Sequence, residues 1–315
     1  MKISVVLITK KLDPKIEWAL DCLKNQTFKD FEYIIVDGYY NKRKDEVKKL
    51  IIDKGVKFPV LHIPDKPSRW RGQRFALSNA RNTALIFATG QYIVHHDDCC
   101  KMPPNWLEGH LGWLEKGYLA TGSWIGYQFL QDGKGIEGVY GLEYRSKIIK
   151  EPKEISAGWF FGANCSYPLE AALDINGFDE EFDGELGQED INFGIRLERK
   201  GFKTIFDPAL QVEIFMMTHR YEKMIPPVNK MLNDGKLHFS NEWITQRFLS
   251  DVTRTMPYGN VIDIRGTRKM MKEGGYSIEK MYEMMKGWIN PDKYDWRDGV
   301  LIEDKLNKEE KFNVE

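Results

Sequence analysis

The stretch QYIVHHDDC, at residues 91–99, joins a short apolar run to two consecutive aspartates, Asp97 and Asp98. Runs of this length and composition predict a buried strand, so both carboxylates are expected where that strand ends. A pair of acids in this position can bind a divalent cation that neutralises a diphosphate. The alternative is an acidic turn that caps a following helix, and the surrounding pattern has to decide between the two.

Strand and helix signals alternate around this stretch. Three more apolar runs predict strands, at residues 3–8, 33–36 and 58–63. Helical spacing predicts helices between the strands, at residues 13–23, 41–54 and 73–88. The run 33–36 also ends in an acid, Asp37. Such alternation is typical of an α/β protein with a doubly wound, mostly parallel sheet, whose ligands bind beyond the carboxyl ends of the strands.

The sequence after residue 100 is less regular. Residues 185–200 predict a helix whose first turn contains Glu189 and Asp190. Acids in a first turn usually complement the helix dipole, but a carboxylate there can also act as a general base toward a hydroxyl. Two strands are expected at 204–206 and 212–216, and Pro226-Pro227 then interrupts the pattern. We therefore expect a catalytic domain over residues 1–225 and a mainly helical C-terminal extension over residues 226–315.

Composition and charge exclude several classes of protein. Lys and Arg number 46 against 47 Asp and Glu, which argues against a general nucleic-acid binder because such proteins need a basic face. The longest uncharged stretch, 155–169, is shorter than the roughly 18–20 apolar residues of a spanning helix. The N-terminus lacks a signal-peptide cleavage pattern, and the four cysteines form no CxxC pair. We expect a cytoplasmic protein with no transmembrane segment, for which peripheral contact with a membrane is an option.

Basic residues and a late histidine are further candidates for a site. Four arginines lie between the third and fourth expected strands, namely Arg69, Arg71, Arg74 and Arg81. They suit bidentate phosphate contacts, and a solvated helix face is the alternative. His219 is either a structural histidine or a metal ligand. The GxGxxG string at 133–138 lacks the strand–turn–helix context of a dinucleotide fingerprint and is interpreted as a loop.

Taken together and in order, these segments resemble the GT-A fold glycosyltransferases, most closely family 2. The resemblance rests on SVVLIT, NQTFKDFE and IVDG within residues 4–38, on ARN, GQYIV and DD within residues 80–98, and on INGFDEEF, GQED and RL within residues 175–197. The last group is also similar to the carboxyl part of galactosyltransferase-type relatives. The resemblance covers about residues 2–220. It implies a Rossmann-like, mostly parallel central sheet flanked by helices.

The resemblance implies a role for each matched residue of the donor site. Thr9 and Asp37 would line the nucleoside pocket, and Arg81 would lie near the nucleotide. Asp97 and Asp98 would hold the ribose and the metal-bound diphosphate.

The resemblance also implies the catalytic and metal-binding residues. Asp190 would be the catalytic base, and Glu189 would be its neighbour that binds a sugar. Asp98 and His219 would bind Mn²⁺ or Mg²⁺. Cys99 occupies the third DxD position, where a neutral thiol is a poor ligand for a hard cation. Three outcomes stay open: Asp98 and His219 carry the metal, metal binding is weak, or the site has degenerated.

The activity implied is a hexosyltransferase, typically inverting. The expected donor is a nucleoside-diphosphate sugar, with a UDP-sugar favoured, and the expected acceptor is a glycan or glycolipid hydroxyl in polysaccharide biosynthesis. Trp159, Phe160 and Asn164 are candidates for an acceptor wall, with a buried core as the alternative. A non-catalytic GT-A binding protein is the competing function. A nucleotidyltransferase is less favoured because residues 9–14, TKKLDP, contain no glycine. A homodimer is an option.

Overall fold

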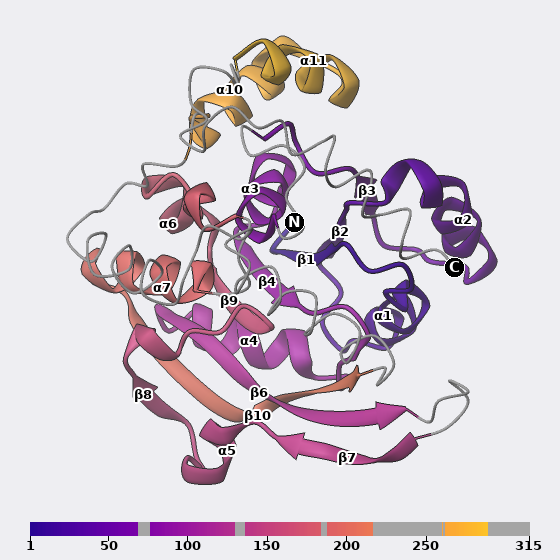
Figure 1. Cartoon of the computed structure of the whole chain (residues 1–315). Helices are drawn as coiled ribbons and strands as arrows, with labels where there is room; N and C mark the ends of the chain where they lie inside the picture. The colour runs from indigo at the N-terminus through magenta and orange to yellow at the C-terminus, as the bar shows by residue number, and fades with distance from the viewer. Residues whose placement is uncertain (69–75, 130–135, 184–187, 217–259, 261, 289–315) are drawn as a thin grey trace, which may run out of the picture.

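The structure is a computed structural model, which describes residues 1–68, 76–129, 136–183, 188–216, 260 and 262–288. A sheet of ten strands runs through this part of the chain in the order β3-β2-β1-β4-β9-β6-β10-β5, with β7 paired to β6 and β8 to β10. Helices cover both faces of the sheet (Figure 1). The α/β fold class is thereby confirmed.

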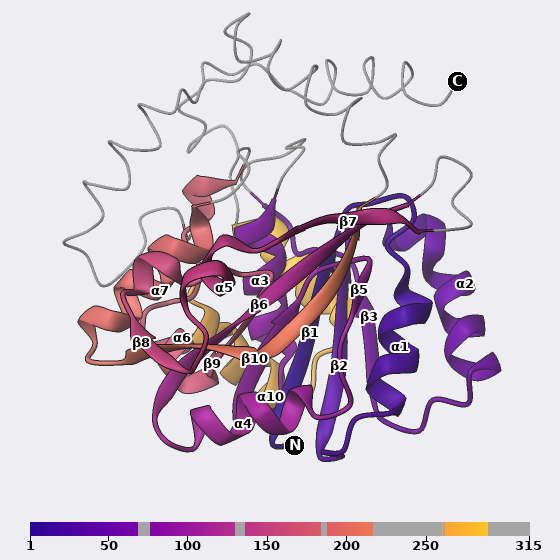
Figure 2. The ribbon, with the colours of Figure 1, turned by 90° about the horizontal axis from the view of Figure 1, so that it is seen from below.

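The N-terminal half of the sheet is parallel. β1 (Ile3–Thr9) lies between β2 (Phe31–Asp37) and β4 (Tyr92–His96), and β3 (Val60–Ile63) pairs with β2. Figure 2 shows β1, β2 and β3 in a row. Every residue of β1 and β2 is buried, as expected for strands covered on both faces.

The C-terminal half of the sheet is mixed. β9 (Asn164–Pro168) runs antiparallel to β4 and β6 (Tyr118–Phe129), while β10 (Lys203–Met216) runs parallel to β6. Three strands complete it at the margins, namely β5 (Cys100–Lys101), β7 (Ile136–Leu142) and β8 (Lys153–Ile155). The two strands expected at 204–206 and 212–216 are one strand, β10, because its register with β6 shifts between Asp207 and Val212 without ending the pairing.

The described helices are α1 (Ile16–Lys24), α2 (Tyr40–Asp53), α3 (Leu77–Phe87), α4 (Trp106–Leu114), α5 (Tyr144–Ile148), α6 (Leu169–Asp174), α7 (Glu189–Arg199), α10 (Ile264–Gly274) and α11 (Ile278–Trp288), with 3-10 turns η1 (Ala157–Trp159) and η2 (Glu180–Phe182).

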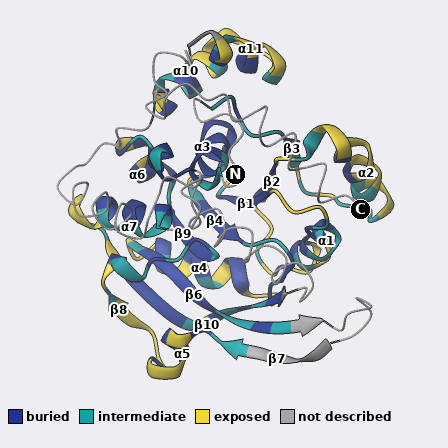
Figure 3. Cartoon of the chain, in the orientation of Figure 1, coloured by how far each residue is buried: buried dark blue, intermediate teal, exposed yellow. Residues whose placement is uncertain are grey.

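Alternate residues of β1 enter two different cores. Leu7 packs in the core with α1 and α4, whereas Val6 packs in the core with α3, α6 and α7. Figure 3 shows the buried faces of these elements turned inward.

The helix expected at 13–23 begins later, at Ile16, because Lys15 at its N-cap adopts a left-handed conformation with φ 56°. Asp13, which the sequence favours as the cap, instead forms an ion pair with Lys15 at 2.6 Å. The helices expected at 73–88 and 185–200 are described as α3 and α7. The C-terminal part of the GxGxxG string belongs to strand β7 rather than to a loop.

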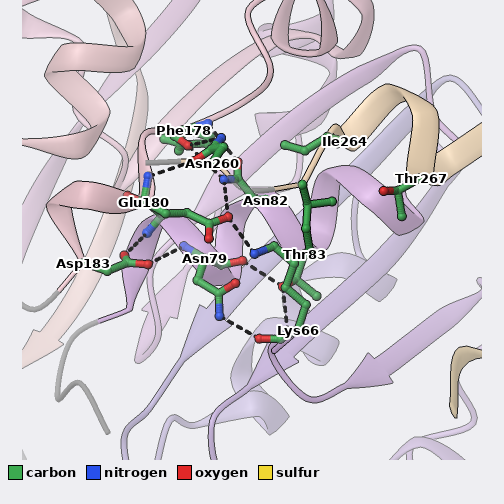
Figure 4. Close-up of polar contacts among 12 residues, drawn as sticks. Lys66, Asn79, Asn82, Thr83, Phe178, Glu180, Asp183, Asn260, Ile264 and Thr267 are labelled. Atoms are coloured by element: carbon green, nitrogen blue, oxygen red, sulfur yellow. Dashed lines mark hydrogen bonds and ion pairs between the residues drawn. The ribbon is translucent and has the colours of Figure 1, made fainter. Parts of the chain in front are cut away.

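A buried polar cluster ties α3 to η2 (Figure 4). The Asp183 carboxylate accepts hydrogen bonds from the backbone N–H groups of Ser78 and Asn79, at 2.8 and 3.0 Å, and so caps the first turn of α3. The Asn82 side chain bonds both backbone groups of Phe178 at 2.8 Å. The ARN and NGFDE segments of the sequence therefore meet as one hydrogen-bonded unit.

The described part of the extension packs on this same unit. Asn260 accepts a hydrogen bond from the Glu180 backbone N–H at 3.0 Å and donates to the Phe178 carbonyl at 2.8 Å. Arg268 of α10 donates to the carbonyl oxygens of Ile86 and Ala88 at the end of α3, at 3.0 and 2.7 Å. Within the expected extension the structure describes α10 and α11. Residues 217–259, 261 and 289–315 lie outside the described chain, so a mainly helical extension that begins at 226 stays a prediction. No helix in the described part of the chain combines the length and apolarity that crossing a membrane requires.

Lys66→Met tests the cluster. The Lys66 ammonium pairs with the buried Glu180 carboxylate at 2.6 Å, so the substitution leaves Glu180 without its charge partner. We expect the free energy of unfolding to fall by about 3 kcal/mol, measured by urea denaturation at pH 7. Lys203→Met is the control: it removes the exposed pair with Glu154 and is expected to change the free energy of unfolding by less than about 0.5 kcal/mol. Equal shifts in the two variants would contradict this account.

Candidate active site

Four predicted site residues gather at the carboxyl ends of β1, β2 and β4. Thr9 and Asp37 are direct neighbours at the ends of β1 and β2, and Asp97 and Asp98 follow β4. The Thr9 hydroxyl donates to the Asp98 carboxylate at 2.9 Å. These contacts bring three strand ends together at one place, as expected for a doubly wound sheet.

The Asp97–Asp98 pair concentrates negative charge. The Lys11 ammonium forms an ion pair with Asp98. Burial and the neighbouring Asp98 carboxylate raise the pKa of Asp97 to about 6, although Lys11 and Arg81 oppose the shift. The pair therefore favours positive charge beside it.

Asp37 is fully buried and its carboxylate has three partners in the described chain. It pairs with Arg43 at 3.1 Å and with His62 at 3.0 Å, and it accepts a hydrogen bond from the Tyr39 backbone N–H at 2.8 Å. Sequence reasoning missed both residues, because Arg43 lies within the helix expected at 41–54 and His62 within the strand expected at 58–63, and neither belongs to a motif.

Glu189 and Asp190 begin α7 and carry different contacts. Glu189 is buried and forms an ion pair with Arg81 of α3. Burial and the Asp190 carboxylate raise the pKa of Glu189, while the Arg81 guanidinium opposes the shift. Asp190 is only half-buried, and its Oδ2 accepts a hydrogen bond from the Gly162 backbone N–H at 2.6 Å. Asp190 is therefore the oriented and more accessible carboxylate of the two.

The candidate acceptor residues have different environments. Phe160 is fully buried, and Asn164 donates to the carbonyls of Ser123 and Leu210 while its Oδ1 accepts from the Trp106 indole at 3.0 Å. Burial of Phe160 and Asn164 favours the core alternative for these two. Trp159 is half-buried and leaves part of its ring accessible.

Cys99 does not fit a hard divalent cation. Cys99 is buried at φ 54°, and its thiol donates to the Asp13 carbonyl at 3.6 Å. Burial raises the pKa of the Cys99 thiol to about 12, so it stays protonated at neutral pH. Within the described ranges no group of three or more His, Cys, Asp or Glu side chains is close enough to hold a metal. His219, like Arg69, Arg71 and Arg74, lies outside those ranges, so a site formed by Asp98 and His219 stays a prediction.

The strand ends described above and the Asp97–Asp98 pair fall within a segment that matches a known protein family. Residues 4–134 match Glycosyl transferase family 2. The matched segment contains Thr9, Asp37, Arg81, Asp97 and Asp98. The resemblance to family 2 is thereby confirmed over these residues.

Solved structures show the same fold. The crystal structure of GalNAc-T7 with UDP, GalNAc and Mn²⁺ is similar at a TM-score of 0.53 and 14% identity, over 69% of this chain and 44% of that one. The structure of S. aureus TarS 1-349 in complex with UDP is similar at a TM-score of 0.51 and 15% identity, over 92% of this chain and 79% of that one. This chain thus spans less than half of the GalNAc-T7 chain. No curated protein matches this chain.

Gly162→Ala tests how tightly the residues around the Arg81–Glu189 pair and Asp190 are packed. A methyl group at Gly162 would overlap the Arg81 guanidinium and lie 3.3 Å from Asp190 Cβ. We expect the free energy of unfolding to fall by about 2 kcal/mol in urea denaturation, because the Arg81 guanidinium would have to move away from its buried ion pair with Glu189.

Gly158→Ala is the matched control in the same loop. Its added methyl would meet Ser156 Oγ at 3.5 Å, an ordinary contact, so the change is expected to stay below about 0.5 kcal/mol. A Gly162 variant as stable as this control would show that the packing around the Arg81–Glu189 pair is loose.

Proposed function

We propose that this chain transfers a hexose from a UDP-sugar to a glycan or glycolipid hydroxyl with inversion. The observation that supports it most is that two groups of charged residues lie near each other. One is Asp97 and Asp98, and the other is Arg81, Glu189 and Asp190. Asp97 and Asp98 face the strand ends, while Arg81 joins the Glu189–Asp190 turn and feels both Asp97 and Asp190 electrostatically. A donor site next to a general base is what glycosyl transfer requires.

The donor would bind across the ends of β1, β2 and β4. Thr9 and Asp37 would contact the nucleoside, and Asp97 and Asp98 the ribose and diphosphate. UDP is the favoured nucleotide because the structures of GalNAc-T7 and TarS that share the fold contain UDP. GalNAc-T7 also contains Mn²⁺, but Cys99 does not fit such an ion, and no step of this mechanism uses one.

Asp190 would act as the base in a single in-line displacement. Its carboxylate takes the proton of the acceptor hydroxyl while the hydroxyl oxygen attacks the anomeric carbon. The bond from that carbon to the diphosphate oxygen breaks, and UDP leaves. The Gly162 N–H fixes the carboxylate before reaction, which avoids reorganisation during the step. Glu189 would hold Arg81 beside the nucleotide, and Trp159 would contact the acceptor sugar.

Polysaccharide biosynthesis on the cytoplasmic side of a membrane is the setting we propose. The acceptor, the linkage and a peripheral contact with the membrane belong to the same proposal.

Asp190→Asn tests the base. We expect the rate of UDP release from UDP-sugars, with a panel of glycan acceptors, to fall by a factor of about 10²–10⁴, because the amide cannot take the proton. UDP affinity, measured by calorimetry, should stay within about twofold because the amide keeps the shape of the side chain. Asp174→Asn, an exposed substitution on α6, is the matched control and should leave both quantities unchanged.

Near-normal release by Asp190→Asn would show that another group is the base. If the wild-type protein binds none of UDP, GDP, CDP and dTDP, with or without Mn²⁺, the transferase proposal is wrong and a non-catalytic GT-A protein takes its place.

A further inference from the structure

Lys11 stands where the Asp97–Asp98 pair meets the loop after β1. Its ammonium forms an ion pair with Asp98 Oδ1, and it also lies close enough to Asp97 to feel that charge. The Lys11 side chain is 46% exposed, whereas that of Asp98 is 12% exposed. An ammonium has three N–H donors, of which Asp98 takes one, so this cation faces both the acids and the open side of the site.

Contacts from three strand ends hold Lys11 in this place. Its backbone N–H donates to the Thr9 hydroxyl at 3.2 Å, and that hydroxyl donates to Asp98 at 2.9 Å. Arg43 donates to the Lys11 carbonyl at 2.5 Å and pairs with Asp37 at 3.1 Å. Lys11 is therefore anchored through its backbone, and its side chain is held by the ion pair with Asp98.

The neighbouring groups explain why positive charge is needed here. Asp97 and Asp98 are adjacent acids, and Arg81, another cation near Asp97, is paired with Glu189. Cys99, which would complete a DxD triplet, turns its thiol to the Asp13 carbonyl. A donor diphosphate would add further negative charge to this cluster.

We propose that the Lys11 ammonium, in place of a divalent cation, faces the diphosphate of the donor and stabilises it as it leaves. This rests on the proposed transferase function. As the sugar–oxygen bond breaks, its electron pair passes to the diphosphate oxygen. Lys11 keeps its proton and donates hydrogen bonds to the phosphate oxygens, while Asp98 orients the ammonium and Asp190 takes the acceptor proton. Charge-assisted hydrogen bonds of this kind strengthen as negative charge develops on the phosphate oxygen that accepts them.

Calorimetry with UDP and UMP separates the diphosphate contact from the nucleoside contact. Each nucleotide is titrated into the full chain in EDTA and in Mn²⁺. In EDTA we expect the wild type to bind UDP at least about tenfold more tightly than UMP, and Mn²⁺ to change UDP affinity by less than about threefold.

Lys11→Met keeps the length of the side chain and removes its charge. We expect this variant to lose the preference for UDP over UMP while its UMP affinity stays within about twofold, which also shows that it is folded. Lys11→Arg should retain most of the preference. Lys54→Met removes a remote exposed pair with Asp21 at 2.6 Å and should match the wild type.

Two results would overturn the role of Lys11 and leave the transferase proposal standing. One is a UDP affinity that is tenfold or more higher in Mn²⁺ than in EDTA, which would mean that a metal displaces Lys11 from Asp98. The other is an unchanged preference for UDP in Lys11→Met. Failure of the wild type to bind UDP and UMP under any of these conditions would refute a UDP-sugar donor and, with it, this role.

Discussion

The buried ion pair between Arg81 and Glu189 is the constraint on which the site depends. Two charges removed from water are tolerated only when they neutralise each other, so α3 and α7 must approach in one relative position. That position sets the turn carrying Asp190 against Gly162 and against the strand ends. The polar cluster around Asn82 and Asp183 joins α3 to the segment around η2, which precedes α7 in the chain.

The buried sheet explains why the chemistry lies where it does. β1 and β2 have no exposed residue, since each packs into a core on both faces. Polar side chains that must meet a ligand can then stand only at the last residue of a strand or beyond it. Thr9, Asp37, Asp97 and Asp98 all occupy such positions, and the short loops after these strands keep them close together.

Much of this arrangement is predictable from local patterns. The strands around β1, the acids at their ends and the amphipathic α7 each follow from residues near in sequence. The partners of the site acids do not follow from local patterns. His62 and Lys11 reach Asp37 and Asp98 from distant parts of the sequence, and Arg43, six residues after Asp37, carries no motif that marks it. Aromatic and amide residues were ambiguous for another reason: the same side chains suit a sugar surface and a core, and only burial separates Trp159 from Phe160 and Asn164.

The contacts of α10 and α11 have a consequence for how such a protein can evolve. Ile264, Met281 and Met285 are fully buried in the same core as α3, and Arg268 closes the end of that helix. These two helices are therefore part of the folding unit rather than an appended module. Recombination that brought in helices with a different apolar face would leave apolar surface of α3 uncovered, so this region has to change together with α3 and not as an independent module.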